Sequence, residues 1–492
     1  MTSISLKSTG RVMAGLIALS ACFARADEGR SEVTAAIPDS SVTTADEVGS
    51  ADVDGTLVVA PIEPASVFRE NVGSDAVCPP LGGRECKPAP AAPPLQPWKL
   101  LFFNNDFSYK QKLDAPYFSG QELKDVPVSL CDEEGSLSFG GELRYRYMNE
   151  LNRLRPGGPG RGTYDLWRWR NYIDYHYSES LRGYVEMIDA SIFDEDLPIT
   201  AIDKNRWDLL NAFVDLRLVE FDDRSVFVRF GRQELLYGSQ RLVSPLDWGN
   251  ARRNFEGFKL FSPGQTWDID VWSVHPLNTA AGNLPISKWD NAFDEPVDSR
   301  YFSGAFATYH GVQNLTNDFY WLWDRDSDLN NTGVDRSRQT VGTRWMQDFP
   351  VTDGCSAPSR IWHAEIEGGY QFGHEADRTV KAGFLTAGGG HTWKSTPWSP
   401  SLWVFYDWAS GDSDPNDDEI NTFDQIFPLN HYYIGWIDNL ARQNISDVNA
   451  RLTASPTKQL KLTAWMHWMD LANDNDFIYS VGGAPVGTRN VG

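Results

Sequence analysis

The sequence predicts an all-β protein, an antiparallel transmembrane β-barrel of about 16–18 strands preceded by a disordered leader. Three observations predict it: long strand-like segments with alternating polarity, an N-terminal export signal, and a 13% aromatic content that includes 19 Trp among 492 residues. A mean hydropathy of −0.41 excludes a protein with many membrane helices, which need about 20 consecutive apolar residues each. Barrel strands carry apolar residues only at alternate positions.

The net charge of the chain limits the kinds of partner that it is expected to bind. The chain has 67 acidic and 44 basic residues, giving a net charge of −23 at pH 7. Nucleic acids require a basic face, so we expect no nucleic-acid partner.

The first element, residues 1–26, is predicted to be a secretory signal peptide. Lys7 and Arg11 precede an apolar stretch over 12–21, and Ala24-Arg25-Ala26 forms an A-x-A cleavage site. An alternative overlaps it, because Leu19-Ser20-Ala21-Cys22 fits a bacterial lipoprotein box with a lipid on Cys22. Either signal exports the chain, which predicts the outer membrane of a Gram-negative-type bacterium.

Residues 27–96 are predicted to be a disordered acidic leader rich in Pro and Ala. They hold 12 acidic residues, 4 basic residues and one aromatic, Phe68. Such a composition buries too little apolar surface to offset the entropy of ordering the chain. Among the five cysteines, Cys78 and Cys86 bracket a turn that would allow a local disulfide, and no Cys/His spacing predicts a metal site.

Residues 97–492 are predicted to form the barrel. Segments of about 9–14 residues alternate charged with aliphatic or aromatic side chains, longer than the 5–6 residues usual in soluble sheets. Trp167, Tyr177, Trp362, Tyr370 and Trp468 lie near segment ends and are expected in the interfacial aromatic girdles. The fifteen segments are 136–148, 164–178, 181–190, 207–218, 225–234, 252–262, 266–274, 301–309, 317–326, 338–347, 360–372, 379–391, 399–409, 443–454 and 458–469.

Two further expectations concern this architecture. A soluble all-β protein would show the same alternation of side chains along its strands. The side chains that face its core, however, would be mainly Val, Ile and Leu. The chain ends at Gly492 in a Gly/Pro/Val-rich loop instead of a closing strand, which predicts that the closing C-terminal strands are missing or that the sheet is open between its first and last strands.

Arginine dominates the polar faces of the predicted strands. A charge facing lipid costs about 2–4 kcal/mol at the midplane, so these side chains are expected in the lumen, where guanidinium groups attract carboxylates. The alternative is that each arginine pairs with a lumenal acid, namely Glu142, Asp174, Glu186 or Asp215, and only stabilises the wall. The candidate residues on strands are Arg144, Arg146, Arg168, Arg170, Arg182, Arg229, Arg338 and Arg344.

The irregular stretch 231–257 is too long for a hairpin turn. It carries Arg232, Arg241, Arg252 and Arg253, which predicts a loop that constricts the pore, with an ordinary exposed loop as the alternative.

Two weaker patterns in the sequence concern metal binding and catalysis. Asp412, Asp414, Asn416 and Asp418 alternate like the start of a calcium loop but lack the Gly and Glu of an EF-hand. They are weak candidates for a looser surface calcium site, with an ordinary solvated acidic loop as the alternative. Glu365 and Glu367 lie two apart on one strand face, a spacing too common to predict a glycosidase, so neither an enzyme nor a cofactor is expected.

Several motifs resemble the alginate export family of outer-membrane barrels. They are the run 100–109 (LLFFNNDFSY), the 140–144 motif (GGELR), the block from Gly231-Arg232-Gln233 to Asn254-Phe255-Glu256-Gly257, and the 410–431 stretch. The similarity covers about Trp98 to Gly492. It implies an approximately 18-stranded monomeric porin with an electropositive lumen that passes an anionic polyuronate, and it carries over Arg144, Arg232, Arg241, Arg252 and Arg253 as pore residues.

The expected function is therefore passage of an anionic polysaccharide or oligosaccharide through an arginine-lined lumen. A general or neutral-solute porin and a soluble secreted carbohydrate-binding β-protein are the alternatives.

Overall fold

The computed structural model describes residues 97–107, 120–130, 133–152, 160–221, 224–278, 293–352 and 358–487. The predicted signal peptide, the predicted leader and all five cysteines lie outside these described residues, so these expectations remain predictions.

The described residues are folded almost entirely as β-strands, and each of the fifteen predicted segments overlaps one strand, which confirms the predicted fold class. The short strands β1, β9, β16, β19 and β20 were not predicted. The strands are β1 (Val126–Leu130), β2 (Glu133–Leu151), β3 (Arg161–Ser178), β4 (Leu181–Phe193), β5 (Asn205–Phe221), β6 (Arg224–Gln233), β7 (Phe255–Ser262), β8 (Trp267–Asn278), β9 (Glu295–Pro296), β10 (Arg300–Tyr309), β11 (Leu315–Asp326), β12 (Arg336–Val351), β13 (Arg360–Glu375), β14 (Arg378–Thr392), β15 (Ser401–Ala409), β16 (Glu419–Ile420), β17 (Ile445–Ala454), β18 (Leu462–Asp470), β19 (Ile478–Tyr479) and β20 (Pro485–Val486).

Helical structure among the described residues is limited to short 3₁₀ turns. They are η1 (Phe102–Asn104), η3 (Gln121–Leu123), η5 (Leu329–Asn331) and η6 (Asn430–Tyr432). In this part of the chain no helix has the length and apolar character needed to cross a membrane.

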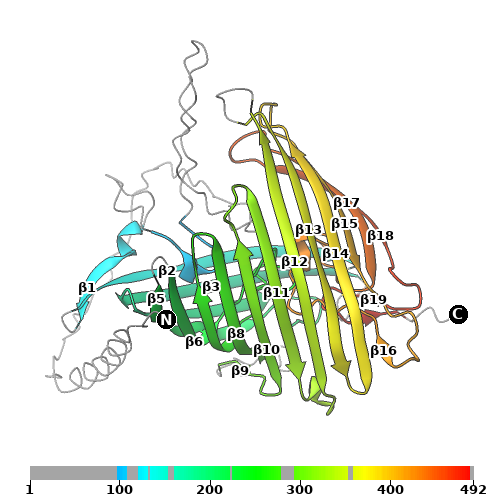
Figure 1. Cartoon of the computed structure of the whole chain (residues 1–492), viewed down its shortest axis with the longest axis horizontal. Helices are drawn as coiled ribbons and strands as arrows, with labels where there is room; N and C mark the ends of the chain where they lie inside the picture. The colour runs from blue at the N-terminus through cyan, green and yellow to red at the C-terminus, as the bar shows by residue number, and fades with distance from the viewer. Residues whose placement is uncertain are drawn as a thin grey trace, which may run out of the picture. The chain divides into compact units, whose positions relative to one another are not determined.

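One 18-stranded sheet contains all strands except the β19–β20 hairpin (Figure 1). Each long strand pairs antiparallel with the next along the chain, β8 pairs with β10, and β15 pairs with β17. Short β9 extends the sheet beside β8, and β16 lies parallel to β14. Within the described residues no strand pairing joins β18 to β1 or β2, so the sheet is open between its first and last strands, as expected.

The two faces of the sheet differ as the alternation predicts. Large apolar side chains stand exposed on the outer face, such as Leu143 and Phe230, each 70% exposed. Trp167, Trp362, Tyr370 and Trp468 belong to this exposed set.

Tyr177, predicted in the same aromatic girdle, is much less exposed than these residues. Its side chain is only 8% exposed. Its ring lies 6.3 Å from that of Tyr175, and the β3–β4 register shifts between His176 and Ser178 beside it.

The two ends of the strands carry different connections. At one end, which we call the short-turn end, tight turns join β3 to β4 and β5 to β6. At the other, the long-loop end, two long connections leave the sheet: residues 234–254 between β6 and β7, and residues 410–444 between β15 and β17. We call these segment A and segment B.

Candidate functional site

Segments A and B lie against the inner face of the sheet. In segment A, Asn250 donates hydrogen bonds to backbone carbonyls of Trp167 on β3 and Ser191 on β4 (both 3.0 Å), while Arg241 contacts Glu365 on β13 at 2.6 Å. Because β3 and β13 are far apart in the order of the sheet, the sheet curves around segment A. The space that its inner face bounds is called the lumen below.

The two segments also bind each other. The backbone N–H of Ser244 donates to the carbonyl of Phe427 (2.9 Å), and the N–H of Phe427 donates to the carbonyl of Leu242 (3.0 Å). Together they occupy the lumen as one packed unit.

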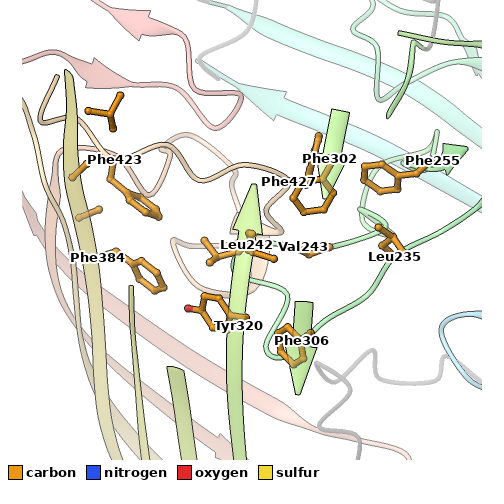
Figure 2. Packing of buried hydrophobic residues seen from close by; sticks show 14 of the residues in the cluster. Leu235, Leu242, Val243, Phe255, Phe302, Phe306, Tyr320, Phe384, Phe423 and Phe427 are labelled. Atoms are coloured by element: carbon orange, nitrogen blue, oxygen red, sulfur yellow. The ribbon is translucent and has the colours of Figure 1, made fainter. Parts of the chain in front are cut away.

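Apolar side chains join this unit to the wall (Figure 2). Leu235, Leu242 and Val243 from segment A and Phe423 and Phe427 from segment B are buried. They meet inner-face residues of strands β7, β10, β11 and β14, namely Phe255, Phe302, Phe306, Tyr320 and Phe384. This part of the lumen is therefore a packed apolar core, whereas an arginine-lined lumen was expected.

Asp247 of segment A is the centre of a buried charge network. Its carboxylate pairs with Arg168 (2.8 Å) and Arg252, and lies 4.0 Å from Arg144. Burial alone would raise the pKa of Asp247, but the charges of Arg168, Arg252 and Arg144 outweigh it and hold that pKa well below its ordinary value. Arg144 also donates to the carbonyls of Asp247 (2.8 Å) and Gly249 (2.6 Å). Segment A is thereby fixed to β2 and β3.

A second set of ion pairs continues this network along the wall. Arg170 pairs with Glu186 at 2.7 Å and lies 3.9 Å from Glu234, which also binds Arg252. The guanidinium of Arg170 stands 3.9 Å from the centre of the Phe102 ring, in the N-terminal segment 97–107. These charged groups are almost completely buried.

Arg182 and Arg229 pair with strand carboxylates. Arg182 binds Asp174 (2.7 Å) and donates to the carbonyl of Phe103 (2.6 Å), while Arg229 binds Asp215 (2.7 Å). Together with Arg168–Glu142 (2.7 Å) and Arg170–Glu186, all four acids named in the wall-stabilising alternative are paired.

The remaining paired arginines lie on β6, β12 and segment A. Arg232 binds Glu256 (3.3 Å) and Asp208 (3.4 Å), and Arg338 binds Glu375 (2.9 Å).

Arg241 reaches both Glu365 and Glu367 at 2.6 Å, and Arg344 binds Asp318 at 2.8 Å and Glu365 at 3.2 Å. The two glutamates therefore anchor segment A to β13, and both are engaged by arginine.

Of the twelve predicted path arginines, Arg146 and Arg253 have no carboxylate partner among the described residues. Arg146 lies 4.6 Å from the centre of the Trp248 ring. Arg253 donates only to carbonyls, Ser244 at 2.9 Å and Pro428 at 3.5 Å. Burial and the charge of Arg300 lower the pKa of Arg253 to about 9. These two cations carry the uncompensated positive charge of the predicted set.

The 412–418 loop does not assemble the calcium site that its spacing suggested. Asp412 pairs with Arg378 (3.4 Å), and Asp414 accepts the backbone N–H of Asn416 (3.0 Å). Among the described residues no three His, Cys, Asp or Glu side chains gather closely enough to hold a metal ion.

Sequence reasoning missed Asp247, which was not distinguished from other loop acids, and Trp248, which stacks on His431 with ring centres 3.6 Å apart. The position of both residues between Arg241 and Arg252 could have indicated them. Several buried arginines in one loop require a counter-charge nearby, and Asp247 supplies it.

A family model described as alginate export matches residues 136–491. No curated protein matches the sequence.

Among solved structures the chain is similar to the outer membrane protein OprD from Pseudomonas aeruginosa, with 13% identity, a TM-score of 0.42, and coverage of 68% of this chain and 73% of that one. It is also similar to Pseudomonas aeruginosa OpdQ (15% identity, TM-score 0.41, 65% and 76% covered) and to Acinetobacter baumannii OccAB1 (12% identity, TM-score 0.40, 65% and 75% covered).

Proposed function

Since the chain belongs to the alginate export family and is an outer-membrane β-barrel porin, we propose that it passes an anionic polysaccharide or oligosaccharide, an alginate-like polyuronate, through its lumen. In this proposal the chain acts as a monomer, as the resemblance implies. The residues that attract the substrate are those whose charge the protein has not already neutralised.

One observation carries the proposal: Arg146 on the inner wall and Arg253 in segment A have no carboxylate partner among the described residues. Arg144 is the most weakly paired of the other ten, because its nearest carboxylate oxygen is 4.0 Å away and its hydrogen bonds go to carbonyl groups. A guanidinium group in a medium of low dielectric lowers the electrostatic cost of bringing a carboxylate into a narrow passage.

The paired arginines have a different role in this proposal. Their positive charges are matched locally, so they hold segment A and the wall in place. A few unmatched cations suit transport better than a fully cationic bore, because a moving polymer must bind weakly at several points and then leave.

The test is the ion selectivity of the purified full chain in planar bilayers. Replacing Arg146 and Arg253 by Gln should move the reversal potential in a salt gradient toward that of a cation-preferring pore. Arg360→Gln is the matched control, because Arg360 is exposed at the first residue of β13. An unchanged reversal potential in the double variant would contradict the proposal.

A neutral-solute porin is the second candidate, and the pairing of ten of the twelve predicted arginines favours it. Liposome swelling separates the two: neutral and anionic sugars of one size would enter equally fast through a neutral-solute pore, and unequally through the proposed one.

A further inference from the structure

A row of side chains crosses five strands of the inner wall near the short-turn end. The register places His363 on β13 opposite Gly390, Gly390 opposite Trp403 on β15, Trp403 opposite Arg451 on β17, and Arg451 opposite Trp465 on β18. Neighbouring strands are about 4.8 Å apart, so the row is about 19 Å long.

These residues share the inner face. His363 lies two positions from Glu365, which binds Arg241 of segment A, and Trp403 lies on the same face as Asp407, which binds Arg442 of segment B. Trp362, between the inner positions, is exposed on the outer face.

Glycine lets the aromatic rings lie flat on this wall. A Cβ atom at Gly390 would stand 2.5 Å from the Trp403 ring, and a Cβ at Gly388 would collide with the ring of Phe405. The Trp403 and Phe405 rings are parallel within 3°, with centres 5.1 Å apart, and His363 stacks on Trp403 at 5.0 Å. Trp403 and Phe405 are half-buried, so each ring has one face against the strand and part of its surface uncovered.

The row continues into segment B. Trp465 lies 5.5 Å from Trp436, whose side chain is 47% exposed, and the guanidinium of Arg451 is 5.7 Å from the Trp465 ring. Aromatic surface and a cation therefore alternate along the row.

This combination fits the chemistry of a pyranose ring that bears a carboxylate. Such a ring has an apolar face of C–H groups, which gains by covering an aromatic face, and a charged edge, which a guanidinium group can bind with two parallel hydrogen bonds. Short turns in outer-membrane barrels face the periplasm, which places the row where an exported chain enters.

We infer that the row His363–Trp403–Arg451–Trp465, extended by Phe405 and Trp436, is a saccharide-binding track at the short-turn mouth of the lumen. It receives successive uronate rings by stacking before they reach Arg146 and Arg253. The inference rests on the proposed function, because it names a subsite for the same substrate class.

The experiment measures how long an oligomannuronate, and a malto-oligosaccharide of the same length, block single channels of the full chain in a planar bilayer. Changing Trp403 and Trp465 together to Ala should shorten both residence times about ten-fold, which corresponds to about 1.4 kcal/mol of lost stacking. The reversal potential in a salt gradient should stay as in the wild type, because no charge is removed.

Two controls keep the test decisive. Trp468→Ala removes a Trp from the same strand, β18, but from the outer face, where the side chain is 54% exposed, and should leave both residence times unchanged. The double variant Trp403→Phe and Trp465→Phe keeps an aromatic ring at each position and should retain most of the residence time. It keeps the track testable if the Ala variant fails to fold.

The outcomes separate the two proposals. Unchanged residence times in a folded Ala variant, or equal losses in the Trp468→Ala control, overturn the track. If the wild type shows no preference for anions while the Ala variant still releases the malto-oligosaccharide faster, the proposed function fails and the track stands as a site for sugar rings.

Discussion

Segments A and B reach the lumen from the same end of the strands, but buried charges and apolar side chains contribute in different proportion to holding them there. Segment A is fixed chiefly by buried charges, with Asp247 bound to Arg168 and Arg252, and Arg241 bound to two glutamates of β13. Segment B is fixed by apolar anchors, with Phe423 completely buried and Phe427 nearly so, and by the buried ion pair of Arg442 with Asp407.

This difference determines how each segment responds to change. Removing one partner of a buried ion pair leaves an uncompensated charge in a low-dielectric surrounding. Removing a buried ring leaves a cavity that the neighbours fill in part. Segment A should therefore be sensitive to pH and to single charge changes, and segment B should be sensitive to lost volume.

The largest effect is expected for Asp247→Asn. The substitution keeps the size of the side chain and removes the negative charge that faces Arg168, Arg252 and Arg144. Two buried cations and the partly exposed Arg144 would then lack much of their counter-charge, so the free energy of unfolding should fall by about 4 kcal/mol. Urea unfolding of the full chain in lipid vesicles, followed by Trp fluorescence, measures it; an unchanged midpoint would mean that charge does not hold segment A.

The same carboxylate predicts the pH dependence. Because the pKa of Asp247 is depressed in the folded protein, its ionised form stabilises the fold at every pH above the unfolded-state pKa of about 4. That contribution is lost as the pH falls further, toward the folded-state pKa. The wild type should therefore lose stability below about pH 4, and Asp247→Asn should show a flatter profile over the same range.

A smaller loss, about 3 kcal/mol, is expected for Phe423→Ala in segment B. The Phe423 ring packs against Phe384 of β14, with ring centres 5.0 Å apart (Figure 2). Phe423→Leu fills much of the same space and should lose about half as much. Neither variant should alter the pH profile, and a profile that changed as in Asp247→Asn would show that the two segments are not held independently.

The strands could be predicted from the sequence because their signal is local. Alternation at Trp362, His363, Ala364 and Glu365 follows directly from the period of two in a β-strand, and the structure repeats it. The ion pairs that the four wall acids form with arginine could also be predicted, because acids and arginines on neighbouring strands face each other once the register is set. The low exposure of Tyr177 could not be predicted, because the register shift beside it leaves no mark in composition or pattern.

The lumenal contacts could not be predicted, because they join residues far apart in the chain. Arg241 and Glu365 are 124 positions apart, and Ser239 and Glu367 are 128 apart. No pattern within segment A tells which strand it meets. The sequence could predict that 231–257 is an irregular arginine-rich segment, but not that Asp247 would neutralise much of its charge.

The smallest effect is expected where charge is exposed. Lys381 on β14 and Glu419 on β16 form an ion pair at the surface, with side chains 50% and 38% exposed. Water and salt screen such a pair, and ordering two long side chains offsets much of its attraction. Glu419→Gln should therefore leave the urea midpoint unchanged within error, at low and at high salt. A loss comparable with that of Asp247→Asn would mean that the location of a charge pair, buried or exposed, does not decide its effect, and the contrast drawn between the two segments would fail with it.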